Sequence, residues 1–328
     1  MRAVVSPYHL TTREPPAMTA LLLASSVVTL LPAPAGGRQA AQAEAEHSPV
    51  YMDFVKSWRW SEALWRAGVV AGTENGDGGP GADVAEAWRM IQGDPACAGA
   101  RALIRRDLYD TEGEYLRAMA IDVLRAGPDP AVSAPVALGL DRYAARHGRT
   151  VMRPDPTSVV QRAEAGLSGP ALTVALPVLL EADGETILRA REALAPELER
   201  LREAIDLALE AMVEPGGGDS ATAARARLRA AASAYQAAFE TQLADLAATV
   251  PEDEPRLVAG LVSLTLASLP ADAALRATAA ATSRLGGPIP RAAAGGGPDD
   301  SEEAQLAVRD PLAGARFGSV VVRVISRG

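Results

Sequence analysis

The stretch of sequence that decides the fold lies at the start of the chain and reads RAVVSPYHLTTREPPAMTALLLASSVVTLL, from Arg2 to Leu31. Arg2 to Ser6 is a short apolar run that predicts a β-strand, and Val27 to Leu31 predicts a second one. Between them, Thr11 to Glu14 has the spacing of a capping box, and Pro15-Pro16 opens a helix. A strand, a helix and a strand in succession indicate that this stretch belongs to a folded sheet.

The same stretch also has the pattern of a secretory signal. Ala17 to Leu31 is almost entirely apolar, and Ala33-Pro34-Ala35 has the small residues of a cleavage site. The folded interpretation predicts a cytoplasmic protein, and the alternative is an exported protein whose signal peptide ends near Ala35. The apolar run is too short to cross a bilayer, so we expect no membrane anchor.

Composition narrows the classes of function. The chain of 328 residues is acidic and alanine-rich, and its net charge of -9 argues against a broad nucleic-acid surface. Its single cysteine, Cys97, excludes an intrachain disulfide and a cysteine metal cluster, and its three histidines are far apart. Lys56, the only lysine, does not lie in a Gly-Lys-Ser/Thr phosphate loop. We therefore expect no metal and no cofactor.

Helix and strand patterns continue along the rest of the chain. Residues 48–166 contain repeated helix start and stop signals and predict an all-helical region. Residues 185–250 carry apolar side chains every three or four positions on both sides of a glycine-rich turn, which predicts a long helical hairpin. Further strands are expected over 171–178 and 257–269, and the valine-rich segment 318–326 predicts a closing strand.

Together these elements predict one mixed domain over residues 1–328. The expected fold class is α+β, predominantly α-helical, with a small sheet that includes the N-terminal and the C-terminal strands lying side by side. The alternative is an α/β fold with a mainly parallel sheet, because strands and helices alternate in the second half of the chain.

The segment from Tyr8 to Glu14 is the first candidate for a ligand site. In open α/β folds, the turn from a strand into a helix lines the ligand crevice. A histidine, an arginine and a carboxylate at such a turn are suited to binding an anion or moving a proton. The simpler interpretation is that the hydroxyl and acidic side chains cap a helix and that Arg13 is solvated. The candidate ligand-binding residues are Tyr8, His9, Thr12, Arg13 and Glu14.

An aromatic cluster is the second candidate. Most of its members repeat at helical spacing and form one stripe, which favours packing in the core. Trp60 lies off this stripe and is the candidate for contact with a protein partner. The residues of the stripe are Tyr51, Phe54, Trp58 and Trp65.

Two further motifs have ordinary structural explanations. Gly76 to Gly81 matches the Gly-x-Gly-x-x-Gly pattern, but Asp77 places a negative charge in the turn and Pro80 removes an amide donor. The acidic residues within 107–114 lie at an expected helix start, where negative charge stabilises the helix without a metal.

The preferred function is a non-catalytic interaction or assembly protein whose amphipathic helices bind a protein partner or a second copy of the chain. The alternative is an enzyme or small-ligand-binding protein with its site at Tyr8 to Glu14. Neither nucleic acid nor a membrane is expected as a partner. A concave pocket around His9 and Arg13, with a carboxylate from the second half of the chain converging on it, favours the alternative, and a flat surface favours the first.

Overall fold

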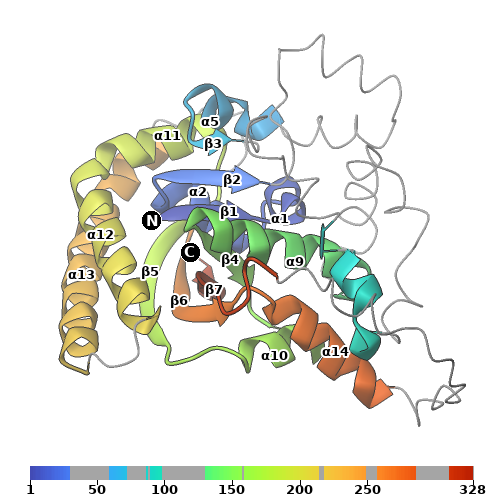
Figure 1. Cartoon of the computed structure of the whole chain (residues 1–328). Helices are drawn as coiled ribbons and strands as arrows, with labels where there is room; N and C mark the ends of the chain where they lie inside the picture. The colour runs from blue at the N-terminus through green and yellow to red at the C-terminus, as the bar shows by residue number, and fades with distance from the viewer. Residues whose placement is uncertain are drawn as a thin grey trace, which may run out of the picture.

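A seven-stranded sheet forms the centre of the molecule, with the strand order β3-β2-β1-β4-β7-β6-β5 (Figure 1). The structure is a computed structural model, and it describes residues 1–29, 59–71, 86–87, 89–97, 130–156, 159–213, 218–248, 257–285 and 310–327. The strands are β1 (Arg2–Val5), β2 (Ser26–Thr29), β3 (Val70–Ala71), β4 (Thr150–Pro154), β5 (Leu172–Glu181), β6 (Val258–Pro270) and β7 (Arg316–Arg327).

The sheet has a parallel part and an antiparallel part. Strands β3, β2, β1, β4 and β7 run parallel, whereas β6 is antiparallel to both β7 and β5. The fold is therefore mixed α/β, which confirms the expected class only in part. Both terminal strands belong to the sheet, but they are not neighbours: β4 pairs with β1 through Thr150 opposite Ala3, and with β7 through Thr150 opposite Gly318.

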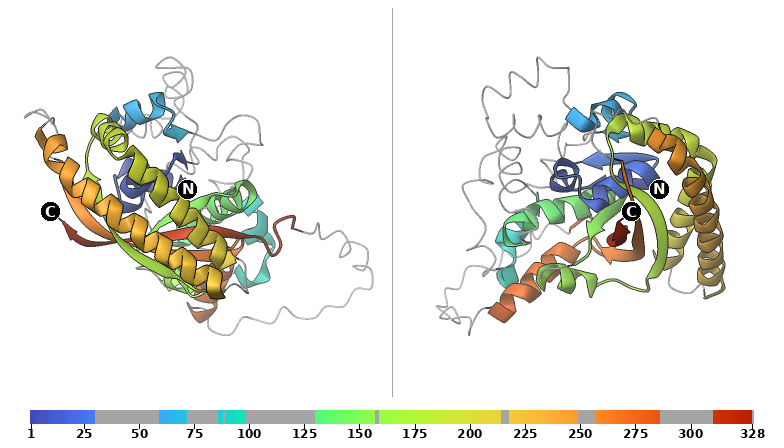
Figure 2. Two further views of the ribbon diagram at one scale, coloured as in Figure 1. Left: turned by 90° about the vertical axis from the view of Figure 1, so that its left-hand side faces the viewer. Right: turned by 180° about the vertical axis from the view of Figure 1, so that it is seen from behind.

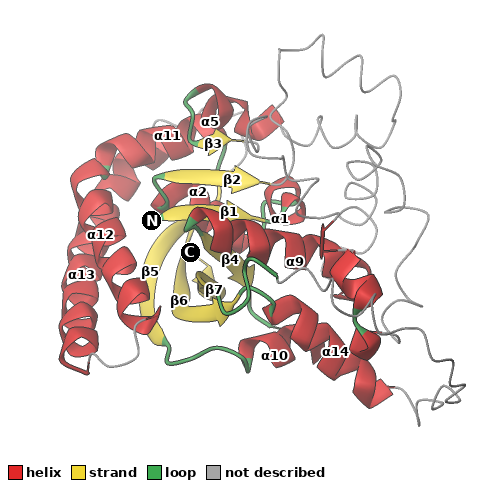
Figure 3. Cartoon of the chain, in the orientation of Figure 1, coloured by secondary structure: helices red, strands yellow, loops and turns green. Residues whose placement is uncertain are grey.

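Helices cover both faces of this sheet (Figures 2 and 3). Helices α9, α10 and α14 lie on one side, and α11, α12 and α13 wrap around the other. The helices are α1 (Pro7–Thr11), α2 (Pro15–Leu23), α5 (Glu62–Arg66), α9 (Pro130–His147), α10 (Val159–Ala165), α11 (Gly184–Ala193), α12 (Ala195–Val213), α13 (Gly218–Ala248) and α14 (Ala273–Leu285), with short 3-10 helices at Arg59–Ser61 and Pro95–Cys97.

The structure differs from the sequence prediction in three stretches. The region 48–166 is not all helical, because it contains β3 and β4. The predicted capping box is also absent: Thr11 ends α1, and Glu14 precedes α2 without a side-chain hydrogen bond to it. Residues 184–248 form three helices, of which α12 and α13 lie side by side and bury the apolar stripe of each.

Helix α2 explains the signal-like apolar run. All its residues from Pro16 to Leu23 are buried, and the helix touches β1, β2, β4, β5 and β7. A helix that is apolar all round needs such an enclosed place in the core. The next segment is β2, which lies inside the sheet between β1 and β3. The apolar composition of 17–29 is thus what this position in the fold requires.

Two arginines from the outer helices bind the C-terminal end of α2. Arg191 of α11 donates from Nη1 to the carbonyl oxygens of Leu21 and Ala24, at 2.7 and 2.6 Å. Arg202 of α12 donates from Nε to the carbonyl oxygen of Leu23 at 2.6 Å. Burial lowers the pKa of Arg191 to about 10, and repulsion by Arg202 adds to this shift, so Arg191 stays charged at neutral pH. Positive charge is favourable at this end of a helix.

Replacing the first of these arginines tests the attachment of the outer helices to the core. Arg191→Met leaves several buried carbonyl oxygens without a donor, so we expect the free energy of unfolding to fall by about 2 to 3 kcal/mol. The control is Arg200→Met on α12, whose exposed ion pair with Glu197 spans 2.6 Å, and which is expected to cost less than about 0.5 kcal/mol. Urea unfolding measures both. Equal losses in the two variants would contradict this account of the arginines.

Candidate functional site

The order of the strands reverses at β1. From β1 the chain passes to β2 and β3 on one side, and it later returns to place β4 on the other side. Ligands of open α/β sheets bind outside the carboxyl ends of the strands at such a reversal, because the connections leave in opposite directions and open a crevice. Strands β1 and β4 are parallel and end at Val5 and Pro154, so their carboxyl ends share one edge of the sheet.

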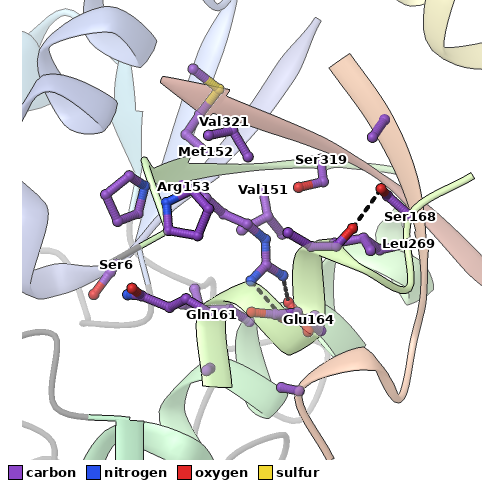
Figure 4. A pocket seen from close by; sticks show the side chains of 18 of the residues that line it. Ser6, Val151, Met152, Arg153, Gln161, Glu164, Ser168, Leu269, Ser319 and Val321 are labelled. Atoms are coloured by element: carbon purple, nitrogen blue, oxygen red, sulfur yellow. Dashed lines mark hydrogen bonds and ion pairs between the residues drawn. The ribbon is translucent and has the colours of Figure 1, made fainter. Parts of the chain in front are cut away.

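A cavity of about 200 Å³ opens at this edge. Ser6 and His9, which follow β1, form part of its wall together with Arg153 of β4. Figure 4 shows Ser6 and Arg153 at this cavity. From there it extends between the sheet and helices α9, α10 and α14. Most of the wall is apolar or carries only hydroxyl groups. The apolar lining side chains include Val136, Ala137, Leu140, Val151, Ala267, Leu269, Ala274 and Val321.

A buried ionic cluster opens onto the cavity. The guanidinium of Arg153 forms ion pairs with Asp141 of α9 and with Glu164 of α10, the second at 2.6 Å from Nη1 to Oε1. Figure 4 shows this guanidinium turned away from the sheet toward Glu164. Asp141 is 0% exposed and Glu164 is 7% exposed. A cluster so deeply buried is costly unless its charges are balanced.

The two carboxyl groups of the cluster face one guanidinium, so the charges of the cluster balance only if one carboxyl group carries a proton. Burial raises the pKa of Asp141 well above its ordinary value, and the positive charge of Arg153 opposes this shift. The charge of Glu164 and a hydrogen bond between Glu164 and Asp141 raise the pKa of Asp141 further. A hydrogen bond between two carboxyl groups exists only when one of them is protonated. Among the described residues, Oδ2 of Asp141 is buried and has no hydrogen-bond partner. Two carboxyl groups facing one guanidinium therefore favour the protonated form of Asp141, as in paired carboxyl groups at acid–base sites.

His9 completes the polar part of the wall. Its side chain is half-buried. Burial lowers the pKa of His9 to about 4, and the positive charge of Arg153 adds to the shift. The imidazole is therefore neutral at physiological pH. A neutral histidine and a protonated carboxyl group at one cavity provide an acceptor and a donor of protons.

The other predicted site residues lie elsewhere. Arg13 adopts a left-handed backbone conformation with φ 54° and places its guanidinium 4.8 Å from the centre of the Trp60 ring. Thr12 is exposed, and Glu14 lies at the start of α2; none of these three lines the cavity. Tyr8 belongs to α1, but its side chain lies outside the described part of the structure. Of the predicted site residues whose side chains the structure describes, only His9 lines the cavity.

Trp60 is half-buried and packs against the hydrophobic core besides its contact with Arg13. The structure does not test whether it contacts a partner, and that role stays a prediction. Several predicted features lie outside the described residues: Tyr51, Phe54 and Trp58 of the aromatic cluster, the motif Gly76 to Gly81, and the acidic residues of 107–114. Cys97 is buried, and the described ranges contain no group of three or more metal-ligating side chains.

The main polar residues of the cavity were not identified from the sequence. Arg153 lies in a strand that the pattern did not reveal, and its two partners come from helices before and after it. Asp141 and Glu164 belong to the middle of the chain, whereas the expectation placed the converging carboxylate in the second half. The partners of Arg153 are close to it in space, but the three residues form no recognisable sequence motif. Only the prediction of a strand between two helices could therefore have pointed to Arg153.

Comparison with known proteins adds no analogy to this geometry. Neither protein families, nor curated proteins, nor solved structures give a match to the chain. Within the described ranges, no helix has the length and apolarity needed to cross a membrane. The cavity and its side chains are therefore the features from which a function can be inferred.

Removing the cation of the cluster is expected to destabilise the fold strongly. Arg153→Met leaves two buried carboxyl groups without their counter-ion, which costs about 3 to 5 kcal/mol. The control is Arg323→Met on β7, because Arg323 is 70% exposed and lies 3.7 Å from Asp155; its expected cost is below about 1 kcal/mol. Chemical denaturation at neutral pH compares the two, and a small loss for Arg153→Met would contradict the description of the cluster as buried.

The lowered pKa of His9 predicts a pH dependence. Between about pH 4 and 6.5 the unfolded chain binds a proton at His9 that the folded chain does not, so stability falls as the pH falls through this window. His9→Gln removes this contribution, and we expect the variant to lose about 1 to 3 kcal/mol less than the wild type between neutral pH and about pH 4.5.

The raised pKa of Asp141 acts in the opposite direction, because its stabilising contribution is lost as pH rises. The difference between wild type and His9→Gln therefore isolates the histidine. An NMR titration of the imidazole provides an independent check. A midpoint near the ordinary histidine value would contradict the buried, neutral state.

Proposed function

We propose that the protein binds a small, largely apolar organic molecule in the cavity at the carboxyl ends of β1 and β4. The observation that carries this proposal is the opening of a buried cluster of two carboxyl groups and one guanidinium onto an otherwise apolar cavity. Ligand sites typically combine apolar walls with a few convergent polar groups and with titratable groups of perturbed pKa. An ionic cluster that served only to stabilise the fold would have no need of an adjacent cavity.

The size of the cavity limits the ligand. A dry cavity of about 150 Å³ lined by aliphatic side chains holds a benzene molecule. The cavity here, of about 200 Å³, therefore suits one ring or a short branched chain with one polar substituent. The polar substituent would face Arg153, Asp141 and Glu164, and the apolar part would lie between β6, β7 and α14.

This proposal takes up the alternative interpretation of the sequence, with the site moved from Tyr8–Glu14 to the cavity beside His9. Proton transfer to or from the bound molecule is the chemistry that the neutral His9 and the shared carboxyl proton would support. The preferred interpretation, binding of a protein partner by amphipathic helices, stays an untested prediction. The large apolar side chains that remain exposed in the described residues are Leu207 of α12 and Ile325 of β7.

Filling the cavity tests the proposal. Ala274 of α14 lines it and is 3% exposed, so Ala274→Leu occupies the space that a ligand would take. We expect benzyl alcohol, measured by ligand-observed NMR, to bind the wild type and to bind Ala274→Leu at least about tenfold more weakly. The matched control is Ala280→Leu at an exposed position of the same helix, which is expected to bind like the wild type.

Circular dichroism and the melting temperature establish that both variants are folded. Two results would contradict the proposal: no saturable binding of any small aromatic probe, neutral or charged, by the wild type at millimolar concentration, or equal binding by folded Ala274→Leu. Either result would leave the cavity as a packing defect between the sheet and α14.

A further inference from the structure

The charged groups at the cavity do not balance without a proton. Two carboxyl groups, Asp141 and Glu164, share a single guanidinium, that of Arg153. His9 is the other titratable group on the wall, and it is neutral. Arg142, next to Asp141 in the sequence, is engaged elsewhere, because it pairs with Glu86 and Asp310 at 2.7 and 2.9 Å. The described part of the wall thus contains one more acidic group than basic group.

We infer that the ligand of this cavity is an organic amine, whose ammonium group binds the two buried carboxyl groups, Asp141 and Glu164, that pair with the single guanidinium of Arg153. This inference rests on the proposed ligand binding and specifies its chemistry. The exchange is balanced: the amine enters as a cation, Asp141 becomes a carboxylate, and the proton that it held is released to the solvent. No other group has to change its charge.

The unsatisfied oxygen of Asp141 favours an amine over a neutral ligand. Asp141 lines the cavity, and among the described residues its buried Oδ2 has no hydrogen-bond partner. An ammonium N–H can donate to this oxygen, and a charge-assisted hydrogen bond is about twice as strong as a neutral one. A neutral alcohol could donate as well, but it would leave the acidic excess of the cluster unchanged.

The remaining groups around the cluster disfavour an anion. Besides Asp141, Glu164 and Arg153 themselves, the elements packed around the cluster contribute Gln161 from α10, His9 from α1, Thr265 from β6, Ser319 from β7 and Thr278 from α14. These described side chains provide hydroxyl, amide and neutral imidazole groups but no second cation. A ligand carboxylate would lie close to Glu164, and like charges in a buried place repel strongly.

A series of three probes with the same ring and different charge tests the inference on the full chain. Benzylamine, benzyl alcohol and benzoate are titrated by isothermal calorimetry at about pH 5.5, in two buffers with different enthalpies of ionisation. We expect benzylamine to bind at least about tenfold more tightly than the other two. We also expect benzylamine binding to release close to one proton, because the raised pKa of Asp141 keeps this group protonated before the amine binds.

Variants assign the effect to the cluster. Asp141→Asn and, independently, Glu164→Gln should abolish both the proton release and the preference for the amine. Asp155→Asn is the control, because Asp155 is a half-exposed carboxylate outside the cavity wall, and it should leave both unchanged. Two separate variants keep the test valid if one of them does not fold.

The outcomes separate this inference from the proposed function. If benzyl alcohol or benzoate binds as tightly as benzylamine, or if the amine binds without proton release, the amine assignment is wrong and ligand binding stands. If none of the three binds at millimolar concentration, both the amine assignment and the proposed function are wrong.

Discussion

The placement of β1 at the reversal of strand order is the constraint from which the rest of the site follows. Its neighbours β2 and β4 are reached by connections that leave in opposite directions, so the carboxyl ends of β1 and β4 cannot be covered by a single connection. The side chains that follow these two ends, Ser6 and His9 on one side and Arg153 on the other, therefore border a cavity. Helices α9 and α10 close the cavity on the side opposite the sheet and supply the carboxyl groups of Asp141 and Glu164.

The enclosure of α2 supports this arrangement from the opposite face. Because α2 is buried on all sides, the polar groups at its end need partners, and Arg191 and Arg202 provide them from the outer helices. These contacts tie α11 and α12 to the same β1–α2–β2 unit that borders the cavity. The sheet, its enclosed helix and the outer helices thus depend on one short N-terminal segment.

Local sequence patterns predicted most of the strands, because a strand depends mainly on its own run of apolar and β-branched residues. The strands at 2–6, 171–178, 257–269 and 318–326 were expected from their runs of apolar and β-branched residues, and they correspond to β1, β5, β6 and β7. Strand β4 was missed because it is five residues long and ends in Arg153 and Pro154. The available signal was Gly148, which follows α9 in a left-handed conformation with φ 57° and so allows a new element to begin.

The site was less predictable than the fold because its chemistry depends on contacts distant in sequence. His9 could be proposed from its place after a strand, but Asp141, Arg153 and Glu164 have no spacing that marks them as a cluster. The same reasoning included Arg13, which instead turns toward Trp60 because its backbone is left-handed and its guanidinium finds an aromatic face there. The direction of each side chain in that turn depends on tertiary packing, which local sequence does not determine.

The most direct test is a carbon NMR titration of the side-chain carboxyl group of Asp141. We expect its carboxyl carbon to keep the chemical shift of the protonated acid above the pH range in which an ordinary aspartate ionises, because burial and Glu164 raise its pKa. Titration of Asp141 within the ordinary range would contradict this expectation, because Asp141 would then be an ordinary carboxylate and the cluster would hold no proton to exchange.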